Sequence, residues 1–304
     1  MYFAELDDFL NAPLREGKHC ETLSLDISKA YDTVNRNAII NALRESNITG
    51  RMFRYLKDFL CERTFRVRVG TSESTARPMT CGIPQGSVIS VTLFLLAMNP
   101  LFEAIPKNVK CYVYADDILL VAHGTYRKCL RAKIQRAAEC ALEWLSSLDF
   151  RVSIPKCQLL HACNNRRHRG TVQDVKLDHI NIPTVKQMKI LGVHIDHKLI
   201  FQKHAGFRRA AASGAVNMLK MISGKNRGSR DVLIRLVHSL VVPCLLYGST
   251  IVGRRKDIVI PIISPMYNKA IRIASGAFPS SPIKAIMCEA GLLPIESVYS
   301  KRKQ

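Results

Sequence analysis

The sequence predicts an α+β protein of about two domains, and three observations lead to this prediction. Short apolar or alternating runs typical of strands occur between residues 22 and 196, and segments of helical periodicity lie among them. Beyond about residue 200 the pattern turns helical and strongly basic. A chain of 304 residues with 47% apolar content can bury a substantial core. We expect one domain at 1–200 and a second at 201–304.

The first half of the chain begins with a core strand, because residues 22 to 27 are apolar up to Asp26. The elements expected next are amphipathic helices at 35–43 and 52–60, a hairpin of 65–70 with 75–80 across the turn 71–74, and an apolar helix that starts at Val88 after the Gly/Pro loop 81–87. A second hairpin with apolar arms carries Asp116 and Asp117 at its tip. Residues 126 to 147 place six apolar side chains on one face and predict a helix of about six turns.

The second half begins with short strands and ends with helices. The strands are expected at 151–154, 158–162, 174–177 and 188–195, with a basic loop at 163–171. The first helix beyond residue 200 carries a stripe of Phe207, Ala211, Gly214, Met218 and Met221 or Ile222. Further helices are expected around 231–243 and 266–277.

The positive charge lies almost entirely in the second half. The formal net charge is +21, and residues 151 to 304 contribute +19 of it, from 26 basic and 7 acidic side chains. Such an excess favours a long anionic partner, most economically a nucleic acid. A solvated cationic surface or a membrane-facing patch would carry the same charge.

The ten cysteines are scattered, with no CxxC pair and no histidine at zinc-finger spacing, so neither a disulfide framework nor a zinc site is indicated. We expect reduced, mostly buried thiols in an intracellular protein, with nucleus or cytoplasm undecided. The start of the chain lacks a signal-peptide pattern, and the longest apolar stretch, 88–102, is shorter than the ~20 residues of a membrane span. No membrane partner is therefore expected.

Three carboxylates are the best candidates for chemistry. Two unit charges about 4 Å apart repel by roughly 4 kcal/mol at an effective dielectric near 20, so the adjacent Asp116 and Asp117 require a cation nearby. If their hairpin lies beside the strand that ends at Asp26, all three acids converge at one rim. A few carboxylates with substrate phosphates are the ligands that Mg²⁺ prefers. Two such ions about 3.5 to 4 Å apart serve in-line phosphoryl transfer.

Each of these signals also has a purely structural interpretation. An Asp-Asp pair in a hairpin is commonly a solvated turn, and Asp26 can cap the helix that follows it. The loop at 81–87 can be an ordinary turn before a helix. Their combination favours the metal site.

Five motifs follow one another in the order that reverse transcriptases use. They are LDISKAYDTV at 25–34, GIPQGSVIS at 82–90, YADD at 114–117, IPKCQLL at 154–160 and KILGVHID at 189–196. The chain resembles the reverse transcriptase domain of a non-LTR, LINE-type retrotransposon, nearest to the I and jockey-like elements. The resemblance covers nearly the whole chain, including LLYG at 245–248. It implies a right-hand polymerase palm with partial fingers, followed by a basic helical thumb and post-thumb region.

The resemblance assigns catalytic roles to four residues. It implies that Asp26 and Asp116 are the principal ligands of two Mg²⁺ ions and that Asp117 supports them. Lys156 corresponds to a lysine that protonates the departing pyrophosphate. A surface lysine in a turn after Pro155 is an equally open interpretation of this residue.

Four further residues would surround the incoming deoxynucleotide. Tyr31 matches the aromatic steric gate that excludes a ribose 2′-hydroxyl, although a core aromatic would fit the same position. Gln85 and Gly86 belong to a loop whose glycines allow close approach of the backbone, before a helix N-terminus with free N–H groups. Ile27, next to Asp26, completes this set.

Contacts to the template and primer are implied for the second half of the chain. KILGVHID resembles the primer-grip hairpin, in which Leu191 and Gly192 matter for shape and backbone contact; an ordinary core strand is the alternative. Basic residues on or near the first tail helices could contact the phosphate backbone or be merely solvated. They are Arg208, Arg209, Lys220, Lys225, Arg227 and Arg230.

The resemblance implies an RNA-directed DNA polymerase, a nucleotidyltransferase that extends a DNA primer with dNTPs on an RNA template. Endonuclease and ribonuclease H domains of the same polyprotein would be further partners. The chain starts about 25 residues before Asp26, which leaves no room for the family's earlier fingers motifs. A truncated, inactive remnant that only binds nucleic acid is therefore the alternative hypothesis.

Overall fold

The computed structural model describes residues 5–10, 16–163, 174–224 and 229–301, and its contacts form two compact units. The sheet unit consists of the described residues of Gly17–His161 and Asn165–Val185. The helical unit consists of the described residues of Met1–Glu16, Ala162–Asn164 and Lys186–Gln304. The main part of the helical unit thus begins at residue 186, whereas we expected the domain boundary at 200.

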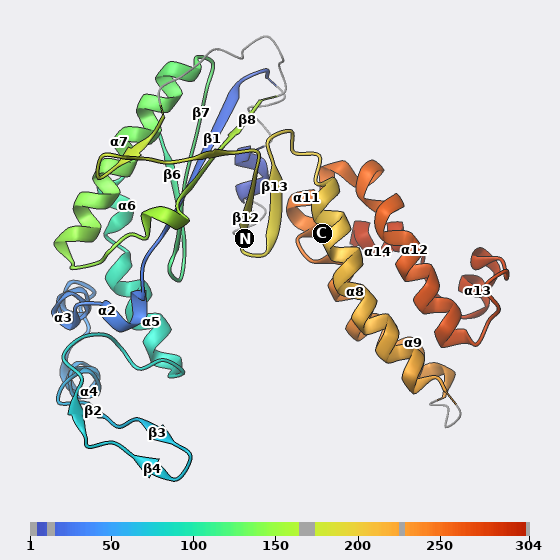
Figure 1. Cartoon of the computed structure of the whole chain (residues 1–304), viewed down its shortest axis with the longest axis horizontal. Coiled ribbons are helices and arrows are strands. Elements are labelled where there is room, and N and C mark those ends of the chain that lie inside the picture. The colour runs from blue at the N-terminus through green and yellow to red at the C-terminus, as the bar shows by residue number, and fades with distance from the viewer. Residues whose placement is uncertain (1–4, 11–15, 164–173, 225–228, 302–304) are drawn as a thin grey trace. The chain divides into compact units, whose positions relative to one another are not determined.

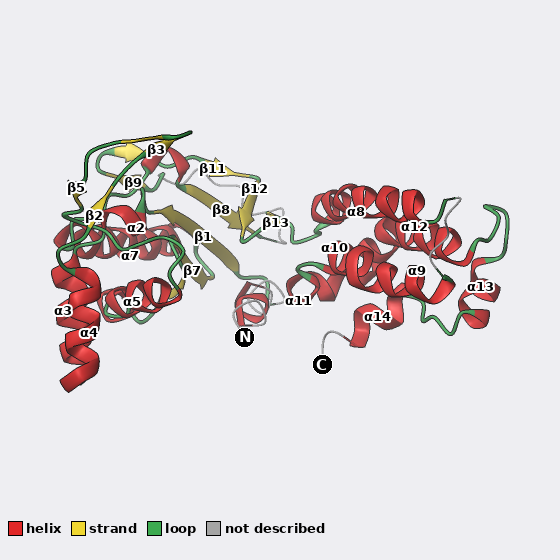
Figure 2. Ribbon diagram, turned by 90° about the horizontal axis from the view of Figure 1, so that it is seen from below, coloured by secondary structure: helices red, strands yellow, loops and turns green. Residues whose placement is uncertain are grey.

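The core of the sheet unit is a five-stranded sheet of order β11-β8-β1-β7-β6 (Figures 1 and 2). Its strands are β1 (His19–Asp26), β6 (Lys110–Tyr114), β7 (Asp117–Gly124), β8 (Gln158–Ala162) and β11 (Thr184–Val185). β7 pairs antiparallel with both β1 and β6, and β11 pairs parallel with β8. β1 is longer than predicted because residues 19–21 pair with residues 122–124.

Helices accompany this sheet, so the predicted α+β class is confirmed. They are α2 (Ala30–Thr33), α3 (Arg36–Glu45), α4 (Gly50–Leu60), α5 (Val88–Met98), α6 (Leu101–Ala104) and α7 (Arg127–Ser147). α7 packs against β1 and β7 (Figure 1). The apolar stripe predicted for this helix, from Leu130 to Leu145, is fully buried in the core.

Two smaller predictions for the sheet unit differ in detail. The predicted hairpin forms, with β2 (Thr64–Phe65) on β5 (Arg77–Pro78) and β3 (Arg68–Val69) on β4 (Ser72–Glu73). Its turn is Gly70–Thr71 rather than 71–74, because Gly70 adopts a positive φ of 61°. The strand expected at 151–154 is reduced to a single bridge, between Val152 and Ile27, before a 3-10 turn at Ile154–Lys156.

Four short strands form two hairpins, one before and one after the unit boundary at residue 186. β9 (Lys176–Leu177) pairs with β10 (Ile180–Asn181) in the sheet unit. β12 (Gln187–Ile190) pairs with β13 (Val193–Asp196) in the helical unit, where β13 contacts the first long helix. This contact explains why the hairpin of β12 and β13 groups with the helices.

The helical unit contains α8 (Gln202–Ile222), α9 (Arg230–Leu236), α10 (Val242–Leu246), α11 (Ser249–Val252), α12 (Lys256–Ser275), α13 (Ile283–Glu289) and α14 (Ile295–Lys301). A π-helical segment at Val237–Val241 joins α9 to α10 just ahead of Pro243, a residue that cannot continue a regular helical ladder. No helix in the described part of the chain is long and apolar enough to cross a membrane.

The stripe noted on α8 faces outward. Phe207, Met218, Met221 and Ile222 are exposed, and the side that packs inward carries His204, Ala205, Ala212, Val216 and Leu219. The side facing the core is therefore lined by small and medium-sized residues, and α12 packs closely against this helix.

All ten cysteines are free, as predicted, but the expectation that most are buried is wrong. Only Cys20 and Cys157 are buried, and three of the others are exposed. Burial raises the pKa of the Cys20 thiol to about 12, so that thiol stays protonated.

A buried ion cluster joins α7 to the sheet. Glu21 on β1 is completely buried and accepts a bidentate pair of hydrogen bonds from Arg131 on α7, at 2.8 to 3.1 Å. His161 on β8 lies 3.1 Å from the same carboxylate, and Arg127 lies 4.0 Å from it. The cluster connects one helix and two strands, and its central pair of Glu21 and Arg131 is buried.

We expect Arg131→Met to destabilise the sheet unit by about 3 kcal/mol, because it leaves the Glu21 carboxylate buried without its main partner. The matched control is Arg136→Met on the same helix, whose exposed pair with Glu139 should contribute less than about 0.5 kcal/mol. The only tryptophan, Trp144, lies on α7, so its fluorescence during urea unfolding reports this unit. Equal destabilisation by both variants would contradict the prediction.

Candidate catalytic site and candidate primer-grip hairpin

The three acidic residues predicted to cluster do meet at one rim of the sheet. Asp26, the last residue of β1, is the register partner of Asp117, the first residue of β7. The Ile27 N–H donates to the Asp116 carbonyl at 3.3 Å, which makes 26 and 117 a non-hydrogen-bonded pair. Facing side chains approach most closely at such pairs, and like charges there repel. Asp116 sits in the two-residue turn between β6 and β7, after Ala115 with φ 52°.

Lys156 supplies a positive charge to this rim. Its Nζ donates to Asp26 Oδ2 at 3.0 Å, and both Asp116 and Asp117 act on it electrostatically. The hydrogen bond and charge of Asp26 raise the pKa of Lys156, which keeps the ammonium protonated. The backbone brings it here because Ser153 N–H bonds to the Asp26 carbonyl, just before the 3-10 turn that carries Lys156.

The three carboxylates at the rim still repel one another despite the positive charge of Lys156. Partial burial raises the pKa of Asp117, the neighbouring Asp116 and Asp26 raise it further, and Lys156 opposes them. Three carboxylates against one ammonium leave a formal charge of −2. The donor set consists of carboxylate oxygens, which suits a hard divalent cation, and the excess charge matches one such ion. The residues present therefore fit a divalent metal site.

Tyr31 lies next to the acids and is held by aromatic packing. Its ring stacks on the buried Phe94 of α5 at 4.8 Å between centroids, and Phe94 meets Phe150 edge to face. Partial burial raises the pKa of Tyr31, and so does the charge of Asp116. The ring is thus both a core contact and a neighbour of the acidic rim, so the two interpretations of this residue are compatible.

The Gly/Pro loop packs against the segment that follows Tyr31. Gly82 N–H bonds to the Val34 carbonyl at 3.0 Å, and Ile83 N–H bonds to the Tyr31 carbonyl at 2.8 Å. Gly82 has φ 77°, and a Cβ there would lie 2.5 Å from the Asp32 carbonyl oxygen. Only glycine permits this approach, so the loop is fixed to the strand-to-helix junction beside Asp26.

Two residues that position this loop were not predicted. Asp32 accepts a hydrogen bond from Gln85 Nε2 at 3.0 Å, and Arg36 donates to the carbonyls of Gly82 and Cys81. Asp32 lies within the LDISKAYDTV motif and Arg36 lies two residues after it, but a pattern of residue types does not show which side chain meets which loop. Gly86 has φ 89° and open space at its Cβ position.

The side chain of Ile27 does not face a substrate. It is 1% exposed and belongs to the hydrophobic core. Only its backbone, which bonds to Asp116, lies at the rim.

Leu191 and Gly192 form the two-residue turn between β12 and β13, as expected for a hairpin. Both have positive φ, 46° and 79°. Tyr247, directly after α10, donates its hydroxyl to the Leu191 carbonyl at 2.6 Å. Asp196 at the end of β13 accepts the N–H groups of Lys198, Ile200 and Phe201 and thereby orders the turn into α8.

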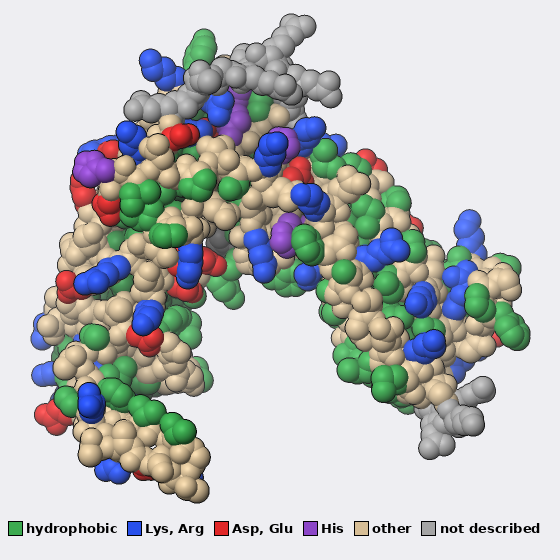
Figure 3. All heavy atoms as spheres, viewed as in Figure 1, with side chains coloured by type: hydrophobic (Ala, Val, Ile, Leu, Met, Phe, Trp, Pro, Cys, Tyr) green, Lys and Arg blue, Asp and Glu red, His purple; other side chains and the backbone are tan. Residues whose placement is uncertain are grey.

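The basic residues of α8 divide into two groups. Arg209 and Lys220 are exposed and lie eleven residues apart, about three helical turns, so they share one side. Arg208 is turned toward Tyr247, with its guanidinium 5.3 Å from the ring centroid. Arg230 pairs with Glu289 at 3.4 Å, and Lys225 and Arg227 lie outside the described residues. On the face shown in Figure 3 the helical unit carries Lys and Arg side chains and few acidic ones.

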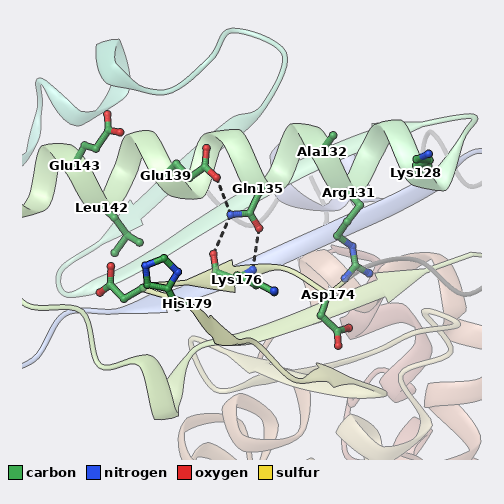
Figure 4. A pocket seen from close by; sticks show the side chains of 11 residues that line it. Lys128, Arg131, Ala132, Gln135, Glu139, Leu142, Glu143, Asp174, Lys176 and His179 are labelled. Atoms are coloured by element: carbon green, nitrogen blue, oxygen red, sulfur yellow. Dashed lines mark hydrogen bonds between the residues drawn. The ribbon is translucent and has the colours of Figure 1, made fainter.

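A cavity of about 810 Å³ between α7 and residues 174–179 contains none of the predicted site residues. Figure 4 shows Gln135 at its centre, bonded to Glu139 and to the backbone of Lys176. Its charged lining has both signs, with Lys128, Arg131 and Lys176 against Glu139, Glu143 and Asp174. Such a lining does not select for an anion or a cation.

Replacing Gly82 by alanine should destabilise the sheet unit by about 3 kcal/mol or more, because the new Cβ meets backbone that cannot yield. Gly86→Ala has the same kind of positive φ but open space, so its cost should be only about 1 kcal/mol. Urea unfolding followed by Trp144 fluorescence measures both. A Gly82 variant no less stable than the Gly86 variant would show that the loop does not depend on this contact.

His204 on α8 should titrate below the ordinary histidine pKa of 6.5. Burial lowers its pKa, the hydrogen bond to the Tyr247 carbonyl opposes this, and Arg208 and His194 lower it further. The neutral ring therefore contributes stability that is fully present above pH 6.5 and is lost as pH falls through the lowered pKa. An NMR titration of its ring protons, compared with the chain in denaturant, checks the midpoint. A pKa of 6.5 or higher for His204 would contradict the buried environment of its ring.

Comparison with known proteins supports the motif assignment. Residues 5–195 match the family described as reverse transcriptase (RNA-dependent DNA polymerase). Among curated proteins, the chain is 26% identical over 260 residues to the RNA-directed DNA polymerase from mobile element jockey of Drosophila melanogaster, covering 83% of this chain and 28% of that protein. It is 25% identical to the probable polymerase from transposon X-element of the same species, covering 85% and 28%.

Among solved structures, a telomerase from Candida tropicalis aligns with a TM-score of 0.47 at 11% identity, over 96% of this chain and 52% of that one. The chain spans about 28% of the length of the two curated relatives. Because the family match covers more than half of the chain, the chain belongs to the reverse transcriptase family, and the predicted resemblance to jockey-like non-LTR elements is confirmed.

Proposed function

We propose that this chain provides the polymerising part of an RNA-directed DNA polymerase of a non-LTR retrotransposon. It would extend a DNA primer 3′-hydroxyl with dNTPs on an RNA template. The observation that carries this proposal is the rim where Asp26, Asp116 and Asp117 meet Lys156, with Tyr31 alongside. Membership of the family supports the same reaction.

The three carboxylates would hold two Mg²⁺ ions. Bound there, the ions would stabilise the attacking and leaving oxygens of an in-line phosphoryl transfer. Asp26 and Asp117 face each other across paired strands, so the ligands are held by the sheet itself. The charge of −2 that remains beside Lys156 accommodates one ion, and the triphosphate would bring the charge that a second requires.

The chain's own residues would supply the remaining steps. Lys156 keeps its proton at Nζ beside the acids and can pass it to the departing pyrophosphate. Tyr31, fixed on Phe94, would exclude a 2′-hydroxyl by its bulk. Gln85, with its amide oriented by Asp32, would lie beside the incoming nucleotide and the templating base.

The helical unit would serve as the thumb. Its exposed Arg209 and Lys220 lie on one side of α8, about 16 Å apart along the helix axis, where they could meet separate phosphates of the template and primer. Relatives whose names include Pol polyprotein support further domains in the same polypeptide, such as an endonuclease or ribonuclease H.

Primer extension on an RNA template tests the proposal. With Mg²⁺ and dNTPs, the chain should extend the primer, and Asp116→Ala should lower the rate at least about 1,000-fold, because several kcal/mol of transition-state stabilisation are lost. Asp58→Ala, an exposed acid on α4, is the matched control and should extend normally. Chelation of divalent ions should abolish extension by every variant.

Two results would count against this function. Extension that survives Asp116→Ala would exclude the proposed metal site. No extension by the unchanged chain, with salt-dependent binding of a template-primer duplex intact, would favour the catalytically inactive remnant.

A further inference from the structure

The turn of the hairpin formed by β12 and β13 is strained. Two-residue turns in which both central residues have positive φ favour Asn-Gly or Asp-Gly. Here the first of these positions is Leu191, with φ 46°. A leucine in this conformation costs roughly 1–2 kcal/mol, so other contacts must stabilise the turn.

Tyr247 makes a contact that can stabilise this turn. Its hydroxyl donates to the Leu191 carbonyl at 2.6 Å, the shortest link between this turn and the helices. The tyrosine itself is fixed at the break between α10 and α11, because Tyr247 is extended and Gly248 is left-handed. The guanidinium of Arg208 lies over its ring. Tyr247 thus stands where α8, the helix break and the hairpin meet.

A second connection runs through His204 on α8. Its Nε2 lies 2.9 Å from the Tyr247 carbonyl oxygen, and its Nδ1 lies 3.3 Å from the backbone N–H of His194 on β13. These partners assign a neutral ring that donates through Nε2 and accepts through Nδ1. The imidazole, 2% exposed, is satisfied at both nitrogens and joins the hairpin to the backbone of Tyr247.

Two glycines allow these surfaces to touch. A Cβ at Gly192 would lie 3.3 Å from the Tyr247 ring. A Cβ at Gly248 would lie 2.8 Å from the Val193 side chain and 3.2 Å from His204. The hairpin and the helix break therefore fit closely as well as being hydrogen-bonded.

We propose that Tyr247 is a positioning residue that fixes the Leu191–Gly192 turn, so that the surface which meets the primer end is carried by the helical unit. This rests on the proposed polymerase function, because it concerns where that reaction holds its primer. Tyr247 acts through Leu191, whose carbonyl it holds. Any rearrangement of the helical unit would then carry the primer contact with it.

Hydrogen exchange tests the positioning without any need for activity. Tyr247→Phe removes only the hydroxyl, and the backbone amides of residues 190–193 should exchange about fivefold faster. The matched control is Tyr267→Phe, which removes a similar hydroxyl bond to the Leu293 carbonyl, 2.9 Å long, in the same unit. It should leave the exchange of the hairpin unchanged. Equal exchange at 190–193 in both variants would overturn the proposal.

A compensating variant distinguishes the backbone strain at Leu191 from a general loss of stability in the helical unit. Asparagine tolerates positive φ, so Leu191→Asn added to Tyr247→Phe should restore slow exchange in the turn. If Tyr247 only stabilised the helical unit in general, Leu191→Asn would not restore slow exchange in the turn. Fast exchange that persists in the double variant would overturn the role assigned to the tyrosine.

Steady-state extension then tests the link to the primer. Tyr247→Phe should raise the KM for primer about fivefold and leave kcat nearly unchanged, whereas Tyr267→Phe should change neither. A fall in kcat at unchanged primer KM would contradict a primer-positioning role. If the unchanged chain extends no primer, the proposed function fails, and the exchange result still decides whether Tyr247 holds the turn.

Discussion

The candidate site depends on the register between β1 and β7. Asp26 meets Asp117 only in this register, and a shift of one residue would turn every side chain of β1 to the opposite face. Apolar cross-strand pairs such as Leu23 with Leu120 oppose such a slip. The buried Glu21 also opposes it, because a slip would separate it from Arg131. The apolar and ionic contacts of β1 therefore hold in place a pair of acids that repel each other.

The same balance of strain and compensation recurs in the helical unit. Leu191 adopts a backbone conformation that leucine disfavours, and the Tyr247 hydroxyl bonds to its carbonyl, while the neutral His204 ring bonds to His194 on the following strand. At the rim of the sheet the unfavourable feature is charge, and Lys156 offsets part of it. In both places local cost is concentrated where the family motifs lie, and neighbouring elements carry the compensation.

Strong periodic patterns could be predicted from the sequence, and local backbone detail could not. The apolar face of α7 was predicted correctly because about six turns of consistent periodicity leave little ambiguity. The stripe from Phe207 to Ile222 also indicated a helix, but its exposure depends on what packs against α8. The strand expected at 151–154 became a single bridge, and most cysteines proved accessible, because tertiary contacts outweigh the preferences of short segments.

The sequence by itself determined the class of fold, the family and the three acids, because these depend on residue types in a fixed order. Only the tertiary structure decided that Asp117 faces Asp26, that Asp32 orients Gln85, that Ile27 points into the core and that Tyr247 reaches Leu191. These contacts join residues far apart in the chain. Their geometry follows from strand register and helix packing, which no local pattern of side chains specifies.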